Sequence, residues 1–181
     1  MEIGEIFIED GSRPEIVAGT ATIGLEILEE LDSLDMAIVP VGNGALIGGI
    51  GTVLKNYDTN IKVIGVQSDK APCMTHSFNA GRPVNTESCN TFAGGIAVRV
   101  AIPEAVDLML EVVDEMWLIS ENEMKRAMTL YYQISDQLLE GAGAAALAAV
   151  LKFSKEVKNK TICLIASGSN VDEKLKQEVL P

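Results

Sequence analysis

Several classes of protein depend on residues that are scarce in this sequence. His76 is the only histidine in 181 residues, so one chain cannot form a zinc site that uses two or more histidines. Lysine and arginine total 14 against 26 aspartates and glutamates, and the net charge is −12. Nucleic acids and anionic membranes both attract positive surfaces, so this charge disfavours both as partners. Its ordinary consequence is solubility.

Disulfide, signal-peptide and membrane-spanning patterns are also missing. Cys73, Cys89 and Cys163 have no Cys-x-x-Cys spacing and cannot all pair, which fits a reducing compartment. No run of about 18 uncharged apolar residues is present, and the N-terminus is acidic where a signal peptide would be basic. We therefore expect a cytoplasmic protein.

Aromatic residues make up only 4% of the chain, whereas 48% of it is apolar and glycines number 16. Apolar runs predict strands at residues 36–40, 62–67, 116–119 and 161–166, and the first has the continuous apolar pattern of a strand buried on both faces. Helical periodicity predicts helices over residues 13–31, 45–57, 103–112, 120–139 and 144–155, with a short one before Gly81. Ser12 with Glu15, and Ser120 with Glu123, have capping-box spacing at two helix starts. The alternation predicts an α/β fold with a mainly parallel sheet and helices on both faces.

A first glycine-bearing turn follows the strand at 36–40. It contains Gly42, Asn43, Gly44 and Ala45 and leads into a helix. Glycine allows a ligand to approach the backbone, and a helix N-terminus offers free N–H groups to a phosphate. A plain strand-to-helix turn would have the same pattern, and the spacing matches neither the dinucleotide fingerprint nor the P-loop.

A second turn, Ser167 to Asn170, follows the last predicted strand. Ligands of open α/β sheets lie beyond the carboxyl ends of the strands, so the Ser167 hydroxyl could face a heteroaromatic nitrogen. The alternative is that Ser169 or Asn170 only caps a helix starting near Val171.

Six segments, taken in order, resemble the fold-type-II pyridoxal-phosphate enzymes, and within them the threonine/serine dehydratases. The segments are 16–26, 42–46, 62–66, 91–98, 139–145 and 167–170. The resemblance runs from about Gly4 to Leu180 and implies an incomplete large (cofactor) domain of the tryptophan-synthase-β-like fold. Residues 13–181 would be the C-terminal part of that domain, and residues 1–12 a remnant of the small domain and crossover.

The resemblance also implies a pyridoxal 5'-phosphate site, whose residues would be Gly42, Asn43, Gly44, Ala45, Ser167 and Glu140. Backbone N–H groups of the first turn would bind the phosphate, or a free phosphate or sulfate. Ser167 would hydrogen-bond the pyridine nitrogen, and Glu140 would lie near the ring. Asn43 and Ala45 replace family glycines, which requires negative φ at both, or a left-handed backbone at Asn43.

Other departures concern metal binding and catalysis. Gln67 and Cys73 stand where many relatives have acidic ligands of a divalent ion, so we expect no metal ligands here. The family's Schiff-base lysine lies in a Ser-aromatic-Lys-x-Arg-Gly motif, and none of the ten lysines has that context. Lys155 comes nearest, at the end of an amphipathic helix. We therefore expect no catalytic residue on this chain.

Three hypotheses about function remain open. The chain is part of a dehydratase that converts threonine or serine to a 2-oxo acid and ammonia, with the lysine supplied by a complementary polypeptide. Alternatively it is a non-catalytic pseudoenzyme or regulatory and assembly module, or a truncated gene product. Racemisation and β-replacement also remain open as sister activities. We expect the isolated chain to be inactive, and to associate with itself or with the missing half.

Overall fold

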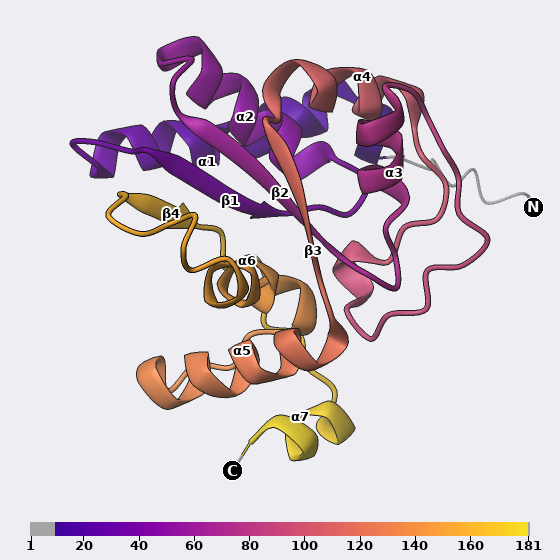
Figure 1. Cartoon of the computed structure of the whole chain (residues 1–181), viewed down its shortest axis with the longest axis vertical. Coiled ribbons are helices and arrows are strands. Elements are labelled where there is room, and N and C mark those ends of the chain that lie inside the picture. Colours follow the sequence, from indigo (N-terminus) through magenta and orange to yellow (C-terminus); the bar gives the residue numbers. More distant parts are fainter. Residues whose placement is uncertain (1–9, 181) are drawn as a thin grey trace, which may run out of the picture.

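The computed structural model describes residues 10–180 and contains a four-stranded sheet between two layers of helices (Figure 1). The strands are β1 (Met36–Pro40), β2 (Lys62–Ser68), β3 (Glu115–Ile119) and β4 (Ile162–Leu164). They pair in parallel in the order β3-β2-β1-β4, which confirms the predicted architecture. Residues 1–9 of the expected small-domain remnant lie outside the described residues.

The helices lie on both faces of the sheet, as predicted. They are α1 (Pro14–Glu30), α2 (Ala45–Tyr57), α3 (Cys73–Ala80), α4 (Pro103–Val112), α5 (Glu121–Ser135), α6 (Gly141–Lys152) and α7 (Glu173–Val179), with the 3-10 turns η1 (Asp10–Ser12) and η2 (Gly94–Ile96). One face packs against α1, α2, α3 and α4, and the other against α5, α6 and α7. No helix between residues 10 and 180 combines the length and apolarity that a membrane span needs.

Several predicted boundaries are wrong for identifiable reasons. The N-cap of α1 is Arg13, without a side-chain cap, because Ser12 belongs to η1. α5 ends at Ser135 instead of 139, because Asp136 takes a left-handed backbone with φ of 56°. α6 begins at Gly141 and ends at Lys152, three residues earlier at each end than predicted.

The cap of the last helix also differs from the alternative considered for the second turn. Asp172 is the N-cap of α7, and its side chain accepts the Leu175 N–H at 2.8 Å. Neither Ser169 nor Asn170 therefore caps a helix. The second turn, Ser167 to Asn170, therefore contributes no N-cap to α7.

The packing of α1 on α2 fixes the start of α2. Thr20 Oγ1 donates a hydrogen bond to the Ala45 carbonyl at 2.9 Å. Gly49 allows this approach, because a methyl group there would collide with Thr20 Oγ1 and lie 2.5 Å from the Val17 carbonyl oxygen. The first turn of α2 is thereby tied to α1.

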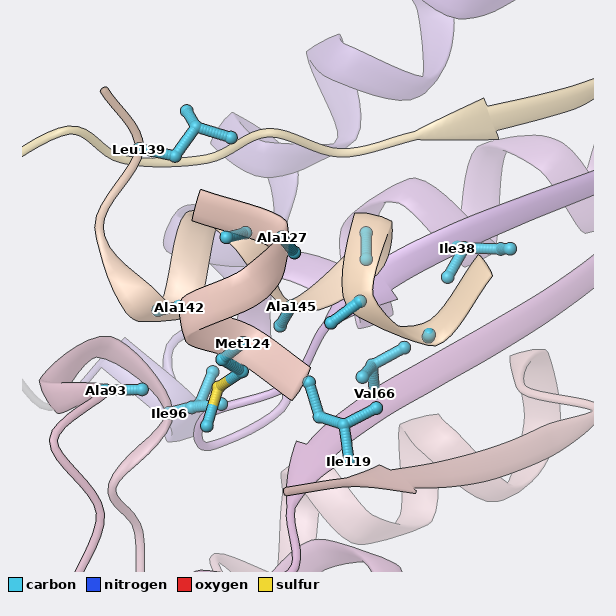
Figure 2. Close-up of a cluster of buried hydrophobic side chains, with 14 of the residues drawn as sticks. Ile38, Val66, Ala93, Ile96, Ile119, Met124, Ala127, Leu139, Ala142 and Ala145 are labelled. Atoms are coloured by element: carbon cyan, nitrogen blue, oxygen red, sulfur yellow. The ribbon is translucent and has the colours of Figure 1, made fainter. Parts of the chain in front are cut away.

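A core cluster of aliphatic, alanine and methionine side chains together with Trp117 joins α5 and α6 to the sheet. Figure 2 shows members of this cluster from the three longer strands, from both helices and from the segment around η2: Ile38, Val66, Ile119, Met124, Ala127, Ala142, Ala145, Ala93 and Ile96. Because α6 presents mainly alanine and glycine, it can lie close to the strands and to η2. This packing positions the beginning of α6 beside the loops described below.

The second capping box is present as predicted. Ser120 N–H donates to Glu123 Oε2 at 2.7 Å, and Ser120 Oγ accepts the Glu123 N–H at 3.4 Å. Lys152 Nζ lies 3.1 Å from the same carboxylate oxygen. Burial raises the pKa of Glu123, but the hydrogen bonds from Ser120 and Lys152 outweigh burial, so the pKa lies below its ordinary value.

We expect Glu123→Gln to lower the free energy of unfolding by about 0.5 kcal/mol at neutral pH, because the amide oxygen can still accept the Ser120 N–H but the charge that attracts Lys152 and the N-terminus of α5 is lost. A lowered folded pKa contributes stability above the unfolded pKa of about 4.3, and this contribution is lost as pH falls through the folded pKa. The difference between wild type and variant in urea unfolding should therefore shrink in acid. Glu29→Gln, at an exposed position of α1, is the control; a difference that stays constant with pH would contradict the assignment.

Candidate functional site

Four loops meet at the carboxyl end of the sheet, around Gly42, Gly95, Glu140 and Gly168. A methyl group added at Gly42 would lie 2.7 Å from the Gly95 carbonyl oxygen. One added at Gly95 would lie 3.3 Å from Glu140 Oε1, and one at Gly168 would lie 2.5 Å from the same atom. The Glu140 N–H donates to the Gly168 carbonyl at 3.0 Å. These contacts run unbroken from the first predicted turn to the second.

The first turn has the backbone that an anion-binding loop needs. Gly44 has φ of +105°, in the left-handed region that favours glycine. Within residues 10–180, Asp136 and Asn159 are the non-glycine residues with positive φ, so Asn43 and Ala45 meet the condition set by the sequence. The N–H groups of Gly42, Asn43 and Gly44 donate to no other described residue. They are available to a ligand at the N-terminus of α2.

The side chain of Asn43 is bound within this turn. Its Oδ1 accepts the Ala45 N–H at 3.1 Å, and its Nδ2 donates to the Asp10 carboxylate. Of the four residues expected to bind phosphate, Ala45 therefore has its N–H already occupied. The sequence did not suggest a contact with Asp10, which is 33 residues away.

Ser167 and Glu140 lie at the opposite end of the chain of contacts. Ser167 is exposed, and its hydroxyl makes no hydrogen bond with another residue of the described part. Glu140 is half-buried beside Gly168 and is the N-cap of α6, without a side-chain cap. Gly143 allows the second turn to approach α6, since a methyl group there would collide with the Gly168 carbonyl oxygen. The predicted ring-side residues are thus neighbours in space.

Gly95 was not among the predicted site residues, although it lies between the two halves of the site. The sequence signal was its adjacency to Gly94, which indicated only a bend. Its contact with Gly42 joins segments about fifty residues apart, beyond the reach of any local pattern.

Gln67 and Cys73 are structural residues in this protein. Gln67 is fully buried, and its Oε1 accepts the Thr75 N–H at 2.8 Å while its Nε2 donates to the Val41 carbonyl at 3.3 Å. Burial raises the pKa of the Cys73 thiol. No group of three or more histidine, cysteine, aspartate or glutamate side chains gathers as a metal site would within the described chain. Both polar ends of Gln67 already have protein partners.

A hollow of about 470 Å³ adjoins the first turn. Its walls come from η1, α1, α2 and α4, and include Arg13, Gly44, Ala45 and Glu104. The ring-side residues Glu140 and Ser167 do not line it. The hollow therefore shares Gly44 and Ala45 with the predicted site but lies apart from its ring-side residues.

Comparisons with known proteins agree with this arrangement. The family described as "Pyridoxal-phosphate dependent enzyme" matches residues 2–168. The L-threonine ammonia-lyase of Thermotoga maritima is 36% identical over 177 residues, covering 98% of this chain and 44% of the relative. The L-threonine dehydratase catabolic TdcB of Escherichia coli is 39% identical over 171 residues, covering 93% of this chain and 52% of the relative.

Among solved structures, the processed form of threonine deaminase isoform 2 from Solanum lycopersicum superposes with a TM-score of 0.92 at 32% identity. That match covers 97% of this chain and 52% of the deaminase chain. The chain spans about half the length of the curated relatives it matches.

We expect Gly42→Ala to lower the free energy of unfolding by about 1–3 kcal/mol, because the new methyl group would push the first turn away from Gly95. Gly94→Ala is the matched control, since a methyl group at Gly94 meets nothing within 4 Å. Urea unfolding of the three proteins measures the effect. Equal stability of the two variants would show that the Gly42–Gly95 contact does not hold the site together.

Proposed function

The chain belongs to the family of pyridoxal-phosphate dependent enzymes, and we propose that it forms part of a dehydratase that converts threonine or serine to a 2-oxo acid and ammonia. In this proposal residues 13–181 are the C-terminal part of the cofactor domain, and residues 1–12 are a remnant of the small domain and crossover. A complementary polypeptide segment supplies the lysine. The observation that carries the proposal is the contact path from Gly42 to Gly168, which joins the expected phosphate and ring contacts in one site.

The residues present fit a phosphate-bearing cofactor. Three consecutive N–H groups without a partner in residues 10–180 lie at the N-terminus of a helix, and a side chain at Gly42 would fill the space beside Gly95. Pyridoxal phosphate, when bound, supplies the electron sink for breaking bonds at the substrate α-carbon. Gly42, Asn43 and Gly44 would hold its phosphate through their N–H groups.

The ring-side residues suit elimination. The Ser167 hydroxyl is neutral, so as partner of the pyridine nitrogen it would leave the ring less electrophilic than an aspartate would. Glu140 would form the wall near the ring from its position beside Gly95 and Gly168. The lysine would bind the cofactor covalently and take the substrate's α-proton, and no lysine of this sequence lies in the motif for that role.

The outer edge of β4, one of the two edge strands, supports the need for a complementary segment. β4 pairs only with β1 among the described strands, and its three residues are partly exposed. A hollow of about 280 Å³ on the α5 and α6 side includes Leu164, and one of about 270 Å³ on the α1 side includes Cys163. Apolar surface therefore flanks the edge strand on both faces, as it would where a sheet continues.

Exposed apolar side chains surround the same edge. Ile134, which lines the hollow beside α5, is 76% exposed, and Leu31, which lines the hollow beside α1, is 37% exposed. Isolated domains rarely leave such surface uncovered next to an unpaired strand. The curated relatives are about twice as long as this chain, and their remaining half is the occupant we propose.

We expect the purified chain to release no ammonia from threonine or serine. When the lysine-bearing N-terminal half of one of the relatives above is added together with pyridoxal phosphate, the mixture should release ammonia. Borohydride reduction followed by mass spectrometry should then locate the cofactor on a lysine of the added half. A cofactor label on one of this chain's ten lysines, together with activity of the chain alone, would refute the proposal.

Two variants test whether the free edge is the docking surface. Ile134→Asp should prevent both complex formation and restored activity, because it places a charge in the apolar hollow beside β4. Val100→Asp, at a position that is 52% exposed and away from the β4 hollows, should leave both unchanged. Analytical ultracentrifugation reports the complex. If the wild-type chain formed the complex with the added half but released no ammonia, this would favour the alternative that the chain is a non-catalytic assembly module.

A further inference from the structure

Asn43 stands where the resemblance implies glycine, and its side chain bridges two segments. The Ala45 N–H can only donate and the Asp10 carboxylate can only accept, so the two ends of the Asn43 amide are assigned by chemistry. Oδ1 faces Ala45 at 3.1 Å, and Nδ2 faces Asp10. The amide thus holds the first turn against η1.

This side chain is not needed for the backbone of the turn. The left-handed position belongs to Gly44, and Asn43 has no positive φ. Gly11 packs against the Asn43 amide, since a methyl group added at Gly11 would lie 3.3 Å from Asn43 Nδ2. An alanine at position 43 could keep the same backbone, so the effect of the side chain can be separated from that of the loop.

The bridge competes with an anion for the same N–H group. A phosphate that binds the start of α2 gains the Ala45 N–H only after Asn43 Oδ1 leaves it. The Asp10 carboxylate, held at the other end of the amide, also opposes a negative charge arriving at this turn.

We propose that Asn43 is a latch that closes the phosphate loop and weakens its affinity for the phosphate group of the cofactor. This inference rests on the proposed function, because it assumes that the turn from Gly42 to Ala45 is the phosphate loop. Release of the latch replaces one internal hydrogen bond by one to the ligand, so its removal should tighten binding about two- to tenfold.

The test is a titration of the whole ¹⁵N-labelled chain, following the backbone amides of residues 42–46 by NMR. Inorganic phosphate is the first probe. Pyridoxine 5'-phosphate is the second, because it has the ring and phosphate but no aldehyde to react with surface lysines. Asn43→Ala should bind both probes about two- to tenfold more tightly than wild type, and its Ala45 amide should exchange faster without ligand. Asn43→Gly is the second latch-free variant if the alanine protein does not fold.

Two further variants separate the latch from other effects. Asn43→Asp keeps an acceptor for Ala45 but adds a charge beside Asp10, so it should bind both probes more weakly than wild type. Asn56→Ala removes an exposed asparagine of α2, whose Nδ2 donates to the Thr52 carbonyl at 2.7 Å. This variant should bind both probes like wild type.

The possible outcomes distinguish the proposal that Asn43 is a latch from the assignment of residues 42–45 as the phosphate loop. Equal affinities of wild type and Asn43→Ala, with the amides of residues 42–46 shifting in both, would overturn the latch and leave the phosphate loop in place. No shift of these amides in any variant, up to the solubility limit of phosphate, would overturn the phosphate loop and the latch together.

Discussion

The parallel pairing of β1 with both neighbours is the interaction on which the site depends. Pro40 lies opposite Val66 in β2, and Ile38 lies opposite Leu164 in β4. The ladder extends past the strand ends, with the Val41 N–H donating to Val66 at 2.8 Å and the Ile165 N–H donating to Ile38 at 3.1 Å. Since the strands run in the same direction and in this register, the loops that follow β1 and β4 emerge side by side.

Close approach of those loops requires positions without side chains. Gly42 and Gly168 lie against a carbonyl oxygen and a carboxylate, and Gly143 lies against the backbone of the second turn. In the core beside Met124, the alanine-rich face of α6 likewise allows close packing because its side chains are small. Glycines at these positions thus allow the elements around the site to pack at short distance.

In our proposal one complementary segment completes both the cofactor site and the sheet edge at β4. The turns after β1 and β4 carry the proposed phosphate loop and the Ser167 hydroxyl, while the outer edge of β4 pairs with no other strand of residues 10–180 and lies between two apolar hollows. A segment that covered this edge would lie next to the loops that follow it. Covering the apolar surface and completing the proposed cofactor site are therefore one structural event in our proposal.

The sequence by itself determined the elements whose signals are local. A continuous apolar run marked β1, whose five residues are all buried, because burial on both faces disfavours polar residues. The pairing of Ser120 with Glu123 marked the start of α5 because both hydrogen bonds lie within one turn. The grouping of Ser167 with Glu140 came from resemblance to a family, since no spacing rule relates residues on different elements.

The tertiary structure decided what depends on contacts between distant segments. Gly141 and Gly143 are poor helix formers, yet α6 starts there because Phe92, Ala93 and the second turn pack against them. Ser12 does not cap α1, because it is the last residue of η1. The Asn43 side chain contacts Asp10, which is 33 residues away in the sequence. Helix and strand signals are carried by neighbours in sequence, whereas these choices are set by close packing between loops, which no local pattern records.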